Sequence, residues 1–410
     1  MISGKSGGSV MKVLAIGGSG GMGRFAVNAT QKLPGVTNII VADLSAAGAE
    51  DFARTCAPHV TAMGLDVTDG KALDEAMSDV DVVMNTSGPF FKLAVPILQA
   101  AINNKCHYLD ICDDWEPTEE LLAMDAAAKK AGISATVGLG ASPGVTNMLG
   151  LLALRELDQV NKMITGWDMS GAQPENESSQ TGTNAAMLHG IEQMTGTVKI
   201  RRNSTFQLVK PLQKIRVDFP GIRPFDAALF GHPEAITFPH HYPELEESMN
   251  VAHGEDATSF LLRSVMQLVD WKIISKTKAA TVLSWIEAKA QYDQQRPVEE
   301  RAPSAYGLAS GMKDRQPARV GSHIDFESLL TPEQDLADLG MGAFTGIPLY
   351  CGVKLLLEGK ISQPGVFAPE GGHIQPEDFF QELFAELSVI IGCDASVLHD
   401  ALKVNRSWDC

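Results

Sequence analysis

The residues best suited to chemistry form a glycine-rich turn near the N-terminus. Gly18, Gly20 and Gly23 have the spacing GxGxxG, follow the apolar run Val13–Ile16 and open a helical pattern. In that context the first glycine permits a tight turn, the second lets backbone amides approach a pyrophosphate, and the third lets the helix pack close to the strand. The helix N-terminus attracts the phosphate charge. The spacing therefore predicts a dinucleotide-binding turn made of Gly18, Ser19, Gly20, Gly21, Met22 and Gly23.

An acidic residue follows at the end of the next expected strand. Asp43 lies twenty residues after Gly23, where a carboxylate accepts hydrogen bonds from the adenosine ribose and repels a 2′-phosphate. No Arg or Lys occurs between Asp43 and Arg54. We therefore expect NAD as the cofactor in preference to NADP. The alternative is a glycine-rich turn beside an aspartate that only faces solvent.

Two more sets of polar residues follow strand ends. Asp66 ends the third expected strand, where its carboxylate either binds the adenine amino group or caps the next turn. Ser87, Gly88 and Pro89 follow the fourth expected strand. This position is the carboxyl edge of the sheet, where cofactor and substrate meet in such folds. We expect all four residues to contribute to the cofactor site.

An acidic run follows the fifth expected strand and supplies candidate catalytic groups. Asp113 and Asp114 lie within Cys112–Glu116. Carboxylates at this edge can hold a substrate ammonium, or exchange a proton where desolvation raises the pKa. The alternative is a helix N-cap and an acidic first turn for the helix expected from Pro117.

Three histidines, His232, His240 and His241, lie within ten residues. Adjacent residues point to opposite faces of a strand, which argues against a metal site at His240 and His241. An imidazole here suits acid–base exchange or carboxylate binding, and we predict that His241 is the catalytic histidine. The alternative is a solvated loop histidine.

One amide residue is a candidate for holding the nicotinamide or the substrate. Asn147 follows Pro143-Gly144 in an expected strand-to-helix turn. Its side chain and the nearby backbone amides suit a carboxamide or a substrate carboxylate. A purely structural helix start is the alternative.

A basic stretch in an otherwise acidic chain supplies candidate anion-binding residues. Residues 199–223 contain seven basic residues against the single acid Asp218. Arginine binds a carboxylate through two parallel hydrogen bonds. We expect Arg223 and one of Arg201 and Arg202 to bind a substrate carboxylate. The alternative is the solvated face of a hairpin.

These residues need a scaffold in which short buried strands alternate with helices. The expected strands span residues 13–16, 38–42, 60–65, 81–85, 107–111 and 134–137. Helical patterns separate them. Such alternation predicts an α/β fold with a Rossmann-type doubly wound parallel sheet over residues 11–144.

The sequence texture changes after Gly144. We expect a mixed α/β substrate and dimerisation domain over residues 145–340, with a helix, a strand, an antiparallel hairpin and two long helices. Their expected ranges are 145–156, 163–169, 197–219, 256–270 and 276–293. Two segments, 171–182 and 296–319, are rich in polar residues, Pro or Gly and are predicted to be loops. Residues 341–410 are predicted to be largely helical and to return to the first domain.

The composition excludes several classes of function. A net charge of −17 over 410 residues repels nucleic acid and anionic membranes. The six cysteines form no CxxC pair and no zinc-like cluster, which predicts free thiols in a reducing compartment and no metal. The polar first ten residues are unlike a signal peptide, and no run of 18 apolar residues occurs. We expect a cytoplasmic homodimer with a small-molecule substrate.

Several short runs resemble the saccharopine dehydrogenase-like (saccharopine reductase) family. They are Asn85–Phe90, His107–Asp110, Gly140–Asn147, Gly231–Glu234, Thr345–Pro348, and Pro364–Val366 followed by Pro369-Glu370. The resemblance implies a Rossmann domain interrupted by a mixed α/β substrate domain, a nicotinamide cofactor and chemistry at a carbon–nitrogen bond. Members act on saccharopine, carboxynorspermidine, lysine and related amino acids, so the resemblance implies a class of substrate and not one compound.

The expected function is therefore an oxidoreductase acting on a C–N bond of an amino acid or an opine-like secondary amine. Two other functions fit the same fold. One is a dinucleotide-binding sensor or scaffold without turnover. The other is a reductase of C=C or C=O bonds.

Overall fold

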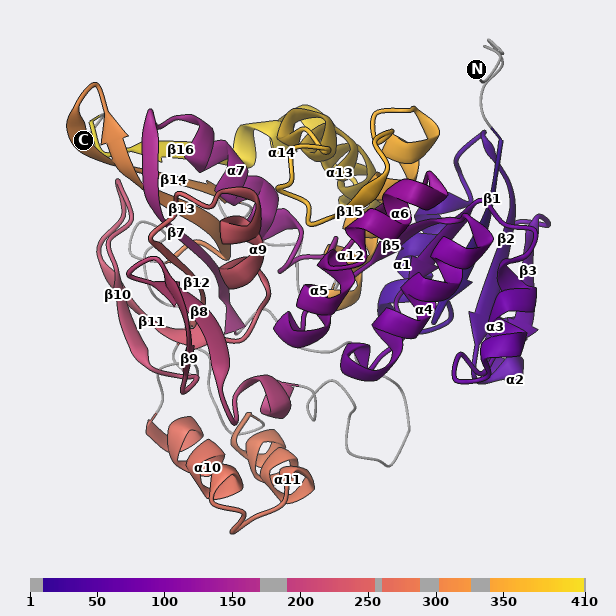
Figure 1. Ribbon diagram of the computed structural model, residues 1–410, viewed down its shortest axis with the longest axis horizontal. Coiled ribbons are helices and arrows are strands. Elements are labelled where there is room, and N and C mark those ends of the chain that lie inside the picture. The colour runs from indigo at the N-terminus through magenta and orange to yellow at the C-terminus, as the bar shows by residue number, and fades with distance from the viewer. Residues whose placement is uncertain (1–9, 170–189, 255–259, 288–301, 326–339, 409–410) are drawn as a thin grey trace. The chain divides into compact units, whose positions relative to one another are not determined.

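The computed structural model describes residues 10–169, 190–254, 260–287, 302–325 and 340–408 (Figure 1). The chain forms two compact units. Unit 1 consists of residues 1–112, 117–140 and 342–386, and unit 2 of residues 113–116, 141–341 and 387–410. The expected loop over residues 171–182 lies outside the described residues.

Unit 1 is built on a seven-stranded parallel sheet in the order β15-β6-β5-β4-β1-β2-β3. Its strands are β1 (Met11–Ile16), β2 (Val36–Asp43), β3 (Val60–Gly64), β4 (Val82–Asn85), β5 (His107–Asp110), β6 (Ser134–Thr136) and β15 (Gly365–Phe367). Its helices are α1 (Gly21–Thr30), α2 (Ala46–Ala53), α3 (Gly70–Met77), α4 (Phe90–Asn104), α5 (Trp115–Leu122), α6 (Asp125–Ala131) and α12 (Gly340–Leu357), joined by the first part of α13 (Pro376–Ile391). The predicted α/β fold with a doubly wound parallel sheet is confirmed.

The strand order of this sheet reverses between β1 and β4, which hydrogen-bond directly to each other. Ligands bind open α/β sheets at such a switch point, beside the carboxyl ends of the strands. Gly17 closes the β1 turn with a φ of +72°, and a Cβ at Gly17 would lie 2.9 Å from the backbone nitrogen of Ser87 in the β4 turn. The two turns therefore lie in close contact, and glycine is needed at this approach.

Two elements from late in the chain complete unit 1. The sequence did not predict β15, which adds to the sheet beside β6. Helix α12 packs against α1 so tightly that a Cβ at Gly346 would lie 2.3 Å from the carbonyl oxygen of Met22. By length and composition α12 is also the one helix among the described residues that could cross a membrane, and most of it is buried in the protein.

Unit 2 is built on a mixed sheet in which β10, β11, β12, β7, β13, β14 and β16 lie in that order. Its strands are β7 (Gln159–Asp168), β8 (Val198–Arg202), β9 (Thr205–Val209), β10 (Lys214–Val217), β11 (Phe225–Phe230), β12 (Glu247–His253), β13 (Ala305–Lys313), β14 (Gln316–Ile324) and β16 (Leu402–Arg406). The helices are α7 (Val145–Arg155), α9 (Glu234–His241), α10 (Phe260–Asp270), α11 (Lys276–Glu287) and α14 (Ala395–Ala401). Figure 1 shows α10 and α11 as neighbouring helices. Their buried apolar residues belong to one cluster with residues of β11 and β12.

The prediction of a loop over 296–319 is wrong for its described part. That part contains β13 and the start of β14, an antiparallel pair in the sheet, with β13 flanked by β7 and β14. Gly307 belongs to the packing surface of β13, since a Cβ there would lie 2.2 Å from the backbone nitrogen of Gly150 in α7. The turn at Asp314 and Arg315 has positive φ at both residues, the geometry of a two-residue hairpin turn.

The contacts divide the C-terminal region between the two units. Residues 342–386 belong to unit 1, and residues 387–410, including β16, belong to unit 2. The domain boundaries expected from the sequence are 11–144, 145–340 and 341–410. They differ from the two units mainly in residues 387–410, which belong to unit 2. That these ranges are independently folding domains stays a prediction.

Candidate functional site

The glycine turn after β1 forms a cradle that only glycine fits. A Cβ at Gly23 would lie 2.3 Å from the carbonyl oxygen of Gly17 and 2.7 Å from the Cα of Gly18. Gly20 caps α1 without a side-chain hydrogen bond, so the helix N-terminus presents backbone N–H groups. This arrangement fits a pyrophosphate, because backbone amides and the helix dipole favour an anion at close range.

The carboxylate of Asp43 lies at the carboxyl end of β2 and contacts this cradle directly. The Ser19 hydroxyl donates a hydrogen bond to Asp43 Oδ2 at 2.6 Å, and the Ser45 backbone N–H donates to Asp43 Oδ1 at 3.3 Å. The structure thus brings two predicted cofactor residues together from separate elements. The position suits recognition of a ribose hydroxyl.

Sequence reasoning did not identify Arg24, because it precedes Asp43 and a cation that binds a 2′-phosphate is expected after that residue. Its Nε donates to the Ser19 carbonyl oxygen at 2.5 Å, and its guanidinium lies 4.8 Å from the centre of the Phe52 ring. The only signal in the sequence was its place directly after Gly23. The structure thus places a cation beside the residue that bonds to Asp43.

Asp66 is exposed and closes a local turn. Its Oδ1 accepts hydrogen bonds from the Thr68 hydroxyl at 2.6 Å and from the Thr68 backbone N–H at 2.9 Å. These bonds, the hydroxyl first, lower the pKa of Asp66. The geometry is that of the turn-capping alternative, and adenine recognition by Asp66 stays a prediction.

A buried polar network holds the β4 turn that contains Ser87, Gly88 and Pro89. The Ser87 backbone N–H and hydroxyl both donate to Asn85 Oδ1, at 3.0 and 2.6 Å. The Asn85 amide donates to the Tyr108 hydroxyl at 3.0 Å, and that hydroxyl donates to Asp110 Oδ2 at 2.8 Å. Burial, and then the Asp110 charge, raise the pKa of Tyr108 well above its ordinary value. This network holds the β4 turn in place through buried hydrogen bonds to β5.

The acidic run and the terminal histidine of α9 lie partly exposed in unit 2. Asp113 Oδ2 accepts from the Gln193 side chain at 3.0 Å, and Asp114 directly precedes α5. His241 is the last residue of α9 and lies edge-on to His240, with ring centres 4.9 Å apart. Catalytic roles for Asp113, Asp114 and His241 stay predictions.

Asn147 is buried, and its side chain supports a helix start. Its Oδ1 accepts the Gly144 backbone N–H at 2.7 Å, which fixes the beginning of α7. This is the structural role weighed above as the alternative, and substrate binding by Asn147 stays a prediction.

The basic stretch over residues 199–223 has many of its charges engaged within unit 2. Ion pairs join Lys210 to Asp270, and both Lys214 and Arg216 to Asp226. Arg201, on the edge hairpin of β8 and β9, donates to the Pro243 carbonyl oxygen at 3.0 Å and lies 5.5 Å from the Phe206 ring centre. Arg202 also lies on β8, partly buried, whereas Arg223 lies exposed before β11. The three arginines stay predictions as carboxylate anchors.

A buried cluster of polar side chains surrounds Glu234 in unit 2. Glu234 is fully buried, and its Oε1 accepts from Ser142 Oγ at 2.6 Å, Thr146 Oγ1 at 2.7 Å and Asn250 Nδ2 at 3.1 Å. Ser142 Oγ also lies 3.0 Å from Nδ1 of His232. These residues come from the turn before α7 and the start of α7, from the β11–α9 connection and the start of α9, and from β12, so no local sequence pattern indicates that they are in contact.

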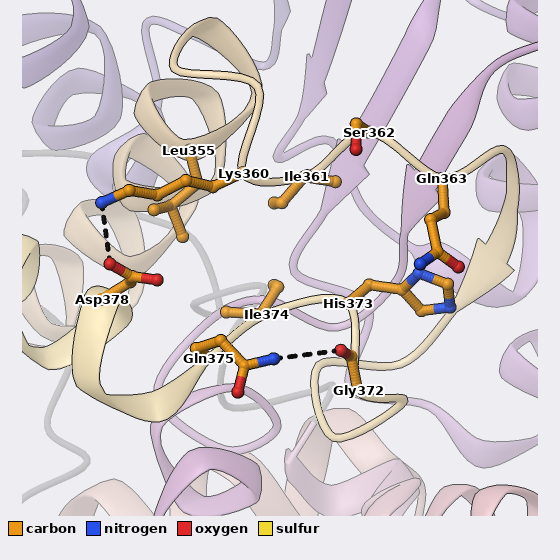
Figure 2. Close-up of a pocket in the computed structure, with 10 residues that line it drawn as sticks. All are labelled: Leu355, Lys360, Ile361, Ser362, Gln363, Gly372, His373, Ile374, Gln375 and Asp378. Atoms are coloured by element: carbon orange, nitrogen blue, oxygen red, sulfur yellow. Dashed lines mark hydrogen bonds and ion pairs between the residues drawn. The ribbon is translucent and has the colours of Figure 1, made fainter.

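A separate pocket of about 170 Å³ lies in unit 1 (Figure 2). Polar side chains at its wall include Lys360, which pairs with Asp378 at 2.8 Å, and His373. It contains none of the predicted site residues and is smaller than the usual 300 Å³ or more of a cofactor or drug-sized ligand site, at roughly half that size. Among the described residues, no group of three or more His, Cys, Asp or Glu side chains could hold a metal ion.

Comparison with known proteins confirms the resemblance to the saccharopine dehydrogenase-like family. Residues 13–136 match the saccharopine dehydrogenase NADP binding domain. The chain is 22% identical over 393 residues to carboxyaminopropylagmatine dehydrogenase of Synechocystis, covering 91% of this chain and 95% of that protein. It is 29% identical over 122 residues to saccharopine dehydrogenase [NADP(+), L-glutamate-forming] of Pyricularia oryzae, covering 30% of this chain and 26% of that protein.

A solved structure shares the fold over almost the whole chain. Apo saccharopine dehydrogenase (L-Glu forming) from Saccharomyces cerevisiae superposes with a TM-score of 0.58 at 16% sequence identity, covering 97% of this chain and 99% of that one. Together with the matched domain and the glycine cradle, these findings support binding of a pyridine nucleotide by the N-terminal unit.

Proposed function

We propose that this saccharopine dehydrogenase-like chain is a pyridine-nucleotide-dependent oxidoreductase acting on a C–N bond of an amino acid or a secondary amine. The observation that carries the proposal is a glycine cradle at the switch point of a parallel sheet, in a chain that aligns over 91% of its length with a dehydrogenase. When bound, the pyridine nucleotide supplies a two-electron donor or acceptor. The protein must then hold the substrate and move its protons.

We propose NAD as the preferred cofactor. Support comes from Asp43, whose carboxylate at the end of β2 disfavours a 2′-phosphate. The matched domain and the Pyricularia relative are both named for NADP instead, and Arg24 beside Ser19 is a cation that suits a phosphate. The two dinucleotides must therefore be compared directly.

The substrate groups are proposed to lie in unit 2. Asp113, Asp114 and His241 are candidates for ammonium binding or proton exchange, and Asn147, Arg223 and one of Arg201 and Arg202 for carboxylate binding. Arg201 donates to the Pro243 carbonyl oxygen and lies over the Phe206 ring. Arg223 is exposed, and a guanidinium binds a carboxylate through two parallel hydrogen bonds.

Oligomeric state and location are proposals of the same kind. We propose a homodimer, supported by large apolar side chains at the surface of α10 and the turn after it, where Phe260 is 80% exposed and Trp271 is 66% exposed. We propose a cytoplasmic location, supported by the free thiols of the described cysteines.

The test is oxidation of NADH and NADPH by the purified full chain against a matrix of oxo acids and amines. The proposal predicts oxidation that requires one oxo acid and one amine together. Oxidation with an oxo acid alone would indicate a carbonyl reductase. Dinucleotide binding without oxidation by any pair would indicate a sensor or scaffold.

A further inference from the structure

The hydrogen bonds of the Glu234 cluster can run in only one direction. An indole N–H is a donor only, so the bond of 3.2 Å from Trp167 Nε1 fixes the oxygen of the Asn250 amide. The Asn250 nitrogen then donates to Thr165 at 2.9 Å and to Glu234 at 3.1 Å. The Glu234 carboxylate is therefore the acceptor at which the donors of the cluster converge.

The donors and acceptors around Ser142 also fix the tautomer of His232. Ser142 has one hydroxyl proton, which it donates to Glu234 Oε1 at 2.6 Å. Its oxygen must then accept from its neighbour 3.0 Å away, so Nδ1 of His232 carries a proton. In the neutral ring with this tautomer, the lone pair is on Nε2.

Two aromatic rings hold the imidazole of His232 in one orientation. The Trp167 ring stacks on it at 5.2 Å with an angle of 8° between the planes, and Phe230 meets it edge-on at 5.0 Å. His232 is only 6% exposed. The ring plane is therefore held in the orientation that places Nδ1 next to the Ser142 hydroxyl.

Glu234 also has an unused oxygen in the described structure. Glu234 is fully buried, and its Oε2 has no hydrogen-bond partner among the described residues. An unsatisfied buried carboxylate oxygen is costly, and functional sites are where such cost is retained.

We infer that His232 is the acid–base residue of the proposed C–N reaction, and that Ser142 and Glu234 are positioning residues that hold its tautomer. This inference rests on the proposed function. Oxidation of the amine, for which a bound pyridine nucleotide would supply the two-electron acceptor, leaves a C=N carbon to which water adds through an oxygen lone pair. His232 Nε2 takes one proton of that water.

The same proton then goes to the nitrogen, and the C–N bond breaks with its electron pair on nitrogen. The remaining hydroxyl proton returns to His232 Nε2, which leaves a carbonyl and a free amine. The proton finally lost to solvent balances the oxidation. The reverse sequence serves reductive condensation of an oxo compound with an amine.

The first test uses ¹⁵N-histidine-labelled full-length protein and long-range ¹H–¹⁵N correlation at a pH above 8. We expect one histidine with a protonated Nδ1 and an unprotonated Nε2 whose pattern changes in both Ser142→Ala and Glu234→Gln. A protonated Nε2 on the residue that responds to these changes would overturn the inference. This measurement needs neither substrate nor cofactor.

The second test uses kinetics with the amine and oxo acid pair that the wild type accepts. Replacing His232→Gln should lower kcat by about 100-fold or more, leave NAD(P)H binding unchanged, and leave the thermal unfolding profile close to wild type. His240→Gln, at an exposed neighbouring position, is the matched control and should keep full activity.

These outcomes separate the two claims. Near wild-type turnover by a folded His232→Gln protein would overturn the inference and leave the proposed function standing. A wild type that turns over no pair would overturn the proposed function, and the role assigned to His232 with it. The ¹⁵N test uses Ser142→Ala and Glu234→Gln, so it still tests the inference if the His232→Gln variant does not fold.

Discussion

The hydroxyl of Ser19 donates a hydrogen bond of 2.6 Å to Asp43 Oδ2, and so ties the glycine turn to the carboxyl end of the neighbouring strand. The carboxylate proposed to bind the ribose is thereby held against the turn proposed to bind the pyrophosphate. Loss of this bond and of the charge should therefore change which dinucleotide binds, with little effect on the sheet.

Replacing Asp43→Ser together with Ala46→Arg should shift preference toward NADP by about tenfold or more, or about 1.4 kcal/mol. The substitution removes the repulsion of a 2′-phosphate and adds a cation at the start of α2. Nicotinamide fluorescence titrations with NADH and NADPH measure the ratio. Arg54→Ala, an exposed change at the end of the same helix, is the control. A wild type that clearly prefers NADPH would overturn the NAD proposal and point to Arg24 as the phosphate-binding cation.

Replacing Asp113→Asn should lower turnover far more than it lowers dinucleotide affinity, because the carboxylate is proposed to contact the substrate and not the pyrophosphate. The asparagine keeps an oxygen for the hydrogen bond from Gln193. Steady-state kinetics and dinucleotide titration on the same preparation give both values. If Asp113→Asn and Asp114→Asn both retain near wild-type rates, these residues serve only the local fold.

Replacing Arg223→Lys should raise the apparent substrate constant by roughly tenfold, since an ammonium lacks the bidentate geometry of a guanidinium. Dinucleotide binding should not change. Arg315→Lys, in the exposed turn between β13 and β14, is a matched control. An unchanged substrate constant at low salt would place Arg223 on the solvated surface.

The stability of unit 2 should fall as the pH drops from about 6.5 to about 4. Burial lowers the pKa of His323 to about 4, with Asp325 opposing this and Lys403 adding to it. An unfolded histidine titrates near pH 6.5, so the unfolded chain binds more protons across this window and stability is lost on acidification. The loss from this group alone is on the order of 3 kcal/mol below pH 4.

His253 adds to this pH dependence in the same direction, because burial lowers its pKa while Asp168 opposes the shift. Urea unfolding followed between pH 7 and 4 measures the effect. His323→Phe should flatten part of the profile, whereas His399→Asn, at an exposed position of α14, should leave it unchanged. A profile that is identical in wild type and His323→Phe would contradict the prediction.

The parallel sheet of unit 1 could be predicted because its strands are apolar runs separated by amphipathic helices, and each strand lies close in sequence to its helix. β13 could not, because Gly307 and Gly311 are usually signs of loops. Here they let β13 approach other backbone, and a Cβ at Gly311 would lie 1.8 Å from the Gln159 carbonyl oxygen. β15 pairs with a strand more than two hundred residues away, which no local pattern records.

The candidate site, like the fold, could be predicted from the sequence only in part. The glycine turn and Asp43 are local signals with a known spacing, so both could be predicted from the sequence. The Glu234 cluster depends on Ser142 and Glu234 meeting across 92 residues of chain, and on Asn250 from a third element. The sequence offered His232 as one of three nearby histidines and Glu234 only as part of a short run, with nothing to indicate that His232, and not His241, is the buried histidine.

The central claim is that hydride moves between the nicotinamide and a carbon bonded to nitrogen. The most direct measurement supplies NADH or NADPH deuterated at the transferred position, with the oxo acid and amine pair found by screening, and locates the label by mass spectrometry and NMR. We predict a secondary amine with one deuterium on the carbon that joins the oxo acid to the nitrogen. A deuterated hydroxy acid with no C–N bond formed, or a labelled carbon away from nitrogen, would contradict the account.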